Sequence, residues 1–147
     1  MKKTIALFLA IVVLCTSGAK ITYATDKIVE KKQTLTFNVY DSIITSWKLI
    51  AVKGTFEWSY NKTKRKLTKS KDISHSVPTC VIGCFAKNFK ESYPWWNTSK
   101  YNSGKAKLSF TYGVGLDTSW ISIAQKKSAW MAVTAYGKGT HSNSFSD

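Results

Sequence analysis

Apolar and polar residues alternate along most of the chain with a period of two residues. In the clearest example, from residue 50 to 60, Phe56, Trp58 and Tyr60 fall on one face while Lys53 and Glu57 fall on the other. This alternation predicts β-strands with one buried face, because successive side chains of a strand point to opposite sides of the sheet. Similar patterns predict further strands at residues 34–40, 67–77, 105–114, 121–123 and 129–136.

The segments between these strands have the composition of turns. Residues 61–64 predict a hairpin turn, and residues 125–128 predict another. Lys69 and Lys71 interrupt the apolar face of the returning strand, which predicts a bulge or a register change near Ser70. The tail from residue 137 is rich in Gly, Ser and Asn and is predicted to be loose.

The number and type of these elements define the expected fold. We predict an all-β domain, an antiparallel β-sandwich or small barrel of about six to eight strands. A helix over residues 120–131 is the weaker alternative, because Thr, Ser and β-branched residues lie on both of its sides.

The N-terminus has the organisation of a secretory signal peptide. Lys2 and Lys3 precede an unbroken apolar run at residues 5–14, which small and polar residues follow. The run is too short for a membrane-spanning helix, which needs about 20 residues. Cleavage after Ala24 is favoured over cleavage after Ala19. We therefore expect a signal peptide at residues 1–24 and a single secreted, extracellular domain at residues 25–147. A lipid anchor on Cys15 is disfavoured, because the preceding residue is Leu14 rather than a small residue.

The charge of the chain is strongly unbalanced. Its 147 residues include 22 Lys and Arg and only 8 Asp and Glu, for a net charge of +14. Removal of residues 1–24 would leave 19 basic and 8 acidic side chains, a net charge near +11. Arg65 is the only arginine, and this usage is typical of AT-rich genomes such as those of many Gram-positive bacteria. Such a charge predicts an anionic partner.

Six positive charges fall within ten residues, with no acid before Asp72; they are Lys62, Lys64, Arg65, Lys66, Lys69 and Lys71. The polyanions outside a Gram-positive cell are teichoic acids, anionic lipid headgroups and extracellular DNA. Lysine suits attraction to such polymers without base reading, so no specific nucleic-acid recognition is expected. The alternative is a solvated hairpin tip whose charge only keeps the protein soluble.

An aromatic segment follows in a stretch without strand alternation. Its candidate surface residues are Tyr93, Trp95 and Trp96. Adjacent tryptophans cannot both point inward from a regular strand, so one of the two is expected near the surface. The segment could close over the core as a lid, stack on the sugar rings of a glycan, or enter a lipid interface.

The domain contains one pair of cysteines, Cys80 and Cys84. Outside the cell the default for such a pair is a disulfide, here closing a small loop that contains Gly83. A metal site with His75 is the weaker interpretation, because a zinc site usually has four ligands. We expect neither a metal nor another cofactor.

No catalytic constellation emerges from the sequence. His141 lies in the predicted tail, and Glu57 with Asp72 is interpreted as a set of cross-strand partners for lysines rather than an acid–base couple. We therefore expect a secreted, non-enzymatic protein that binds an anionic polymer or membrane surface, or a glycan, of a bacterial envelope. A secreted antibacterial or membrane-active protein is the first alternative. An extracellular hydrolase, with a cleft joining His75 to a carboxylate, is the second. The oligomeric state is left open.

Overall fold

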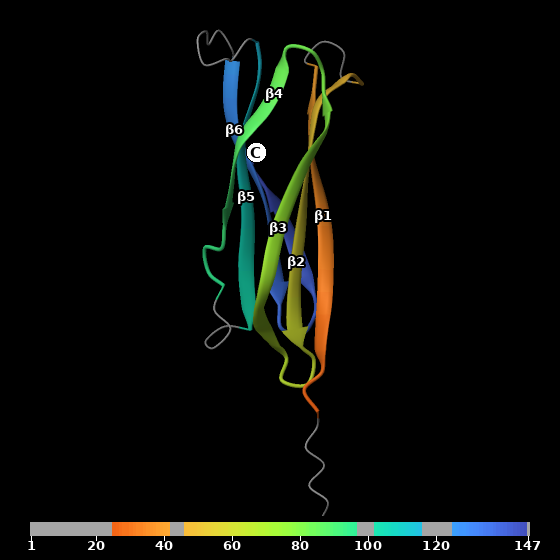
Figure 1. Ribbon diagram of the computed structural model, residues 1–147, viewed down its shortest axis with the longest axis vertical. Coiled ribbons are helices and arrows are strands. Elements are labelled where there is room, and N and C mark those ends of the chain that lie inside the picture. Colours follow the sequence, from red (N-terminus) through yellow and green to blue (C-terminus); the bar gives the residue numbers. More distant parts are fainter. Residues whose placement is uncertain (1–24, 42–45, 97–101, 116–124, 147) are drawn as a thin grey trace, which may run out of the picture.

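The computed structural model describes residues 25–41, 46–96, 102–115 and 125–146, apart from the side chains of Lys69 and Ser70. This part of the chain forms seven β-strands in two antiparallel sheets (Figure 1). Sheet A contains β1 (Ile28–Tyr40), β2 (Lys48–Asn61) and β3 (Lys66–Cys80). Sheet B contains β4 (Cys84–Ser92), β5 (Ser103–Val114), β6 (Gln125–Tyr136) and β7 (His141–Phe145). The predicted all-β, antiparallel class is confirmed.

The two sheets pack face to face around a single core. Phe56 of β2, Leu108 of β5 and Met131 of β6 are almost completely buried and belong to the same hydrophobic cluster. Gly54 allows the sheets to approach closely here, because a Cβ atom at this position would lie only 2.6 Å from Met131 Sδ. The alternation of apolar and polar residues in the sequence thus has its physical cause in this apolar layer, which the two sheets share.

The irregularity predicted near Ser70 is also confirmed. Trp58 pairs with Lys71, whereas Tyr60 pairs with Leu67, so β3 carries two extra residues at this point. The register change keeps both Leu67 and Ile73 buried although two lysines fall between them. A bulge thereby reconciles the charged sequence of β3 with an apolar inner face.

The structure contradicts the turn predicted at residues 125–128. These residues begin β6 and pair with residues 111–114 of β5. All four are exposed, because the β5–β6 ladder extends past the packed core at this end of the molecule. Their polarity therefore reflects solvent around a strand rather than a break in the sheet.

The predicted loose tail is likewise replaced by structure. His141–Phe145 forms the edge strand β7, which pairs with β6. Its sequence lacks apolar alternation because an edge strand can be held by backbone hydrogen bonds. In addition, the His141 ring packs edge-on against Trp58 at 5.6 Å between centroids. The Gly-rich residues 137–139 form the turn that precedes β7.

Strand β4 had no counterpart among the predicted elements. Asn88 adopts a positive φ of 55°, and the register of β4 against β5 shifts between Lys87 and Lys90. This bulge turns Phe89 toward the core and destroys the period of two. The signal peptide at residues 1–24 and the short strand predicted at residues 121–123 lie outside the described residues.

Candidate functional site

The basic run predicted from the sequence surrounds the turn between β2 and β3, at the lower end of the molecule in Figure 1. Lys62, Lys64, Arg65 and Lys66 are all exposed there. The Asn61 side chain accepts a hydrogen bond from the Lys64 backbone N–H at 2.8 Å, and this contact supports the turn. The sequence thus places three cations on a short turn and a fourth, Lys66, at the first residue of β3.

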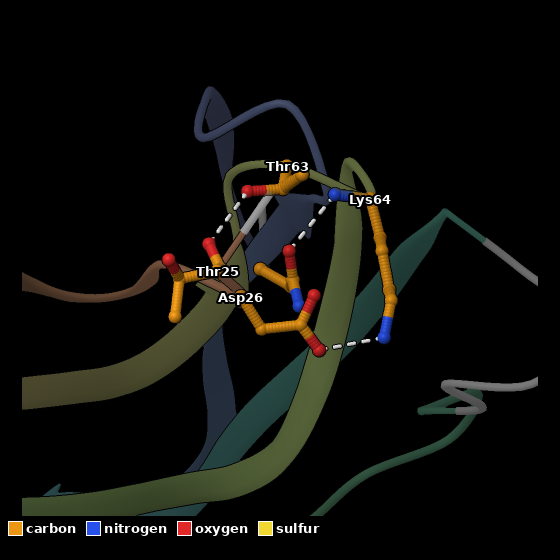
Figure 2. A network of polar contacts seen from close by, with 5 residues as sticks. Thr25, Asp26, Thr63 and Lys64 are labelled. Atoms are coloured by element: carbon orange, nitrogen blue, oxygen red, sulfur yellow. Dashed lines mark hydrogen bonds and ion pairs between the residues drawn. The ribbon is translucent and has the colours of Figure 1, made fainter. Parts of the chain in front are cut away.

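One of these cations has a carboxylate partner. Lys64 Nζ lies 2.6 Å from Asp26 Oδ2, and Thr63 Oγ1 donates to the carbonyl of Thr25 at 3.5 Å (Figure 2). The hydrogen bond from Lys64, aided by Asn61, lowers the pKa of Asp26 below its usual value. Both groups are about half exposed or more, so water screens the pair. Its effect is to join the segment before β1 to the turn and to offset part of the positive charge.

Farther along β3, Lys71 contacts the aromatic segment. Its ammonium group lies 4.8 Å from the centroid of the Tyr93 ring and 5.8 Å from that of Trp96. Burial, followed by the nearby charges of Glu91 and Asp72, raises the pKa of Tyr93. Lys71 is therefore held by ring faces. The side chain of Lys69 lies outside the described residues.

The two adjacent tryptophans have different environments. Trp96 Nε1 donates to the carbonyl of Thr68 at 3.2 Å, and its ring lies against Gly104 and beside the Leu67 side chain. Trp95 is 41% exposed. Trp96 thus closes over the core as the lid interpretation predicted, and Trp95 is the tryptophan left near the surface.

These contacts place the basic run and the aromatic segment side by side. We refer to them together as the hairpin surface, which consists of Lys62, Lys64, Arg65, Lys66, Lys71, Tyr93, Trp95 and Trp96. Cations beside exposed aromatic area can attract an anionic surface and then contact its less polar layer. The sequence alone could not show this proximity, because it depends on β3 packing against the segment that follows β4.

A second group of lysines occurs on the outer face of sheet B. Because of the period of two in β5, Lys105 and Lys107 point to the outer face of the sheet, whereas Ala106 and Leu108 are buried on its inner face. The strand was predicted from the apolar side of this alternation, without its polar side. That polar side was the signal that could have identified this group.

The opposite end of the molecule, where the β1–β2 and β3–β4 connections lie, exposes apolar side chains. Ile82 at the β3–β4 turn is fully exposed, and Tyr40, Trp47 and Val114 are 47%, 55% and 49% exposed. A hydrogen bond from Val81 N to Leu49 O and another from Gly115 N to Gly83 O tie these connections together. This apolar end and the hairpin surface are therefore at opposite ends of the strands.

The two cysteines flank the connection between the sheets. Both are free thiols in this structure, and Cys80 Sγ donates to the Cys84 carbonyl at 3.1 Å. Burial is the main cause of the raised pKa of Cys84, and the neighbouring Cys80 adds to it. Disulfide formation between them stays a prediction.

The candidate catalytic residues His75, Glu57 and Asp72 lie in sheet A, where they contact or pair with other residues of the fold. His75 stacks on the Phe89 ring, with centroids 4.0 Å apart. Glu57 lies opposite Asp72 in the β2–β3 register and forms an ion pair with Lys32 at 2.7 Å. The described residues contain no group of three or more His, Cys, Asp or Glu side chains that could hold a metal ion.

Comparison with known protein families, curated proteins and solved structures gave no match to this chain. Within the described ranges, no helix is long and apolar enough to cross a membrane.

Proposed function

We propose that this protein is a secreted, non-enzymatic binding protein that acts at an anionic bacterial envelope surface through its hairpin surface. The observation that carries the proposal is the contact of Lys71 with Tyr93 and Trp96, because it joins the basic run to the aromatic segment. Four further exposed cations lie at or next to the adjacent turn, and the chain as a whole has a net charge of +14. Long-range attraction would bring the protein to the surface, and Trp95 would add short-range contact.

The test is salt-dependent binding of the protein to heat-killed Gram-positive cells. We expect the variant Lys64→Gln/Arg65→Gln/Lys66→Gln to bind about tenfold more weakly than the wild type at low salt, because surface attraction scales with local charge. The matched control is Lys31→Gln/Lys32→Gln/Lys53→Gln on sheet A, which removes the same net charge. Equal losses in both variants would overturn the assignment to the hairpin surface and leave only a net-charge effect.

The apolar end supports a second candidate, a secreted antibacterial protein that acts on membranes. Trp and Tyr favour the lipid interface, and the fully exposed Ile82 could enter it. Colony counts after incubation with the protein test this candidate, together with dye release from phosphatidylglycerol vesicles. Killing and release that are lost in Ile82→Ser would support it and demote the binding role. Full survival at all doses, without dye release, would reject it.

A further inference from the structure

The outer face of sheet B combines lysines from three strands. The pairing registers of β4 with β5 and of β5 with β6 place five lysines on this face, and no Asp or Glu among the described residues shares it. We call this face the sheet B surface; its lysines are Lys87, Lys90, Lys105, Lys107 and Lys126. The corresponding face of sheet A has mixed charge, with Lys32 paired to Glu57. Among the described residues, the outer face of sheet B therefore carries only positive charges, whereas that of sheet A carries charges of both signs.

Trp130 organises the central lysines of the sheet B surface. Lys107 Nζ lies 4.8 Å and Lys105 Nζ 5.1 Å from the centroid of its half-buried indole ring. The negative face of the ring offsets the repulsion between two neighbouring ammonium groups. On β5 these lysines are two residues apart, about 7 Å along the strand. Two neighbouring outward positions of one strand thus supply two ammonium groups to a single ring.

A shallow hollow of about 330 Å³ adjoins this pair of cations. Lys90 enters it from β4, Lys107 from β5 and Trp130 from β6. Its other polar lining residues can each donate a hydrogen bond to an anionic oxygen: Asn88, Ser109, Thr111 and Ser128. The bulge in β4 contributes Asn88 to this lining. Ammonium, hydroxyl and amide donors therefore converge without a carboxylate, which is the chemistry that a phosphate group requires.

We propose that the sheet B surface is a second binding site, specific for a linear phosphodiester polymer whose repeating units are polyols. Lys90 and Lys107 hold one phosphate at the hollow, and Lys105 contacts the next phosphate along the chain. The Trp130 ring is occupied by the two ammonium groups, so it orients them and does not stack on a base. Lysines act as point charges and do not read bases. These features favour a polyol-phosphate chain over a nucleic acid. The site does not depend on binding by the hairpin surface.

The test is titration of the purified protein with synthetic poly(glycerol phosphate) at two salt concentrations. Three double variants each remove two charges: Lys105→Gln/Lys107→Gln on sheet B, Lys32→Gln/Lys53→Gln on sheet A, and Lys62→Gln/Lys66→Gln at the hairpin. We expect the sheet B variant to lose about tenfold in affinity at low salt. The plot of log affinity against log salt should become less steep by about 1.5 units for this variant, because two phosphate contacts are lost. The sheet A variant should change less than about twofold.

Two further measurements, oligonucleotide binding and thermal unfolding, identify the ligand and exclude misfolding of the variants. A single-stranded oligonucleotide of equal charge should bind more weakly than the polyol phosphate. Stronger oligonucleotide binding that is lost in Trp130→Ala would overturn the proposed ligand in favour of a nucleic acid. Losses no larger than those of the sheet A variant would overturn the site itself. Unchanged thermal unfolding of each variant shows that the fold is intact. A loss confined to the hairpin variant would refute this site but leave the proposed function in place.

Discussion

The hairpin surface and the sheet B surface are both rich in lysine, but they are built differently. Most hairpin cations lie at one turn, where Asp26 pairs with Lys64, and ring faces hold Lys71 farther along β3. The sheet B cations stand on three neighbouring strands, with two of them over one indole ring. A turn gives cations freedom to follow an irregular surface, whereas a sheet fixes the distances between them. Surfaces of similar composition can therefore provide loose attraction in one place and ordered contact in another.

A substitution in the core beneath the sheet B surface should destabilise the protein most. Leu108 is fully buried on β5, between Lys107 and Ser109. Leu108→Ala should lower the free energy of unfolding by about 2–5 kcal/mol, because it removes buried contacts and leaves a cavity. Thr63→Ala at the exposed turn should change it by less than about 0.5 kcal/mol. Urea denaturation of both variants measures the difference. Similar effects would show that the two surfaces depend equally on the core.

Within the hairpin surface, the two tryptophans should differ sharply. Trp96→Ala removes the hydrogen bond to Thr68 and the packing near Leu67, so we expect a loss of about 2 kcal/mol in the free energy of unfolding. Trp95→Ala should change stability by less than about 0.5 kcal/mol but weaken binding to killed cells. Denaturation curves and cell binding of both variants provide the readouts. Equal destabilisation would show that Trp95 is also part of the core.

The carboxylate of Asp26 offsets part of the positive charge of the hairpin surface, through its ion pair with Lys64. Asp26→Asn releases Lys64 from its partner, so binding of the protein to killed cells should rise about twofold at low salt. Glu30→Gln on β1, outside the hairpin surface, is the matched control for net charge and should change cell binding less. Both variants are compared at the same ionic strength. An equal gain in the two would mean that net charge alone governs cell binding.

The smallest effect is a difference in acid titration. The hydrogen bond from Lys64 lowers the pKa of Asp26 below the ordinary value of an aspartate. A lowered folded-state pKa means that any stabilisation by the pair is present above the unfolded pKa. This stabilisation is lost as the pH falls through the folded value. Carboxyl NMR should show a titration midpoint of Asp26 below the ordinary aspartate value, and an upward shift of this midpoint in Lys64→Gln. An unchanged midpoint in that variant would contradict the assigned cause.

Prediction from sequence succeeded where a pattern is local. The alternation around Phe56 revealed a strand with a buried face, and the charges near Ser70 revealed an irregularity in β3. It failed for β4, where Asn88 adds a bulge, and for β7, whose polar sequence is held by its backbone. These elements depend on their partners in the sheet, and a single segment carries no record of them.

The candidate sites, too, could be predicted from the sequence only where their residues are close together along the chain. The run of cations at the hairpin is contiguous and visible in the sequence, and so are Trp95 and Trp96. Their contact through Lys71 required the packing of β3 against another part of the chain. Lys90, Lys107 and Trp130 are separated by many residues, and only the strand registers bring them to one hollow. Sites formed by adjacent strands therefore require knowledge of the pairing.

Every hydrogen-bonded strand pair in the described structure joins neighbours along the chain, from β1–β2 to β6–β7. Each hairpin can therefore form before distant segments meet, which keeps the entropy of loop closure small at every step. Folding is expected to be faster than for a sandwich of similar size whose strands cross between sheets, because the rate falls as paired segments become more distant. The late event is the docking of two preformed sheets across the short turn at residues 81–83. A refolding experiment should thus detect strand pairing before the burial of Phe56.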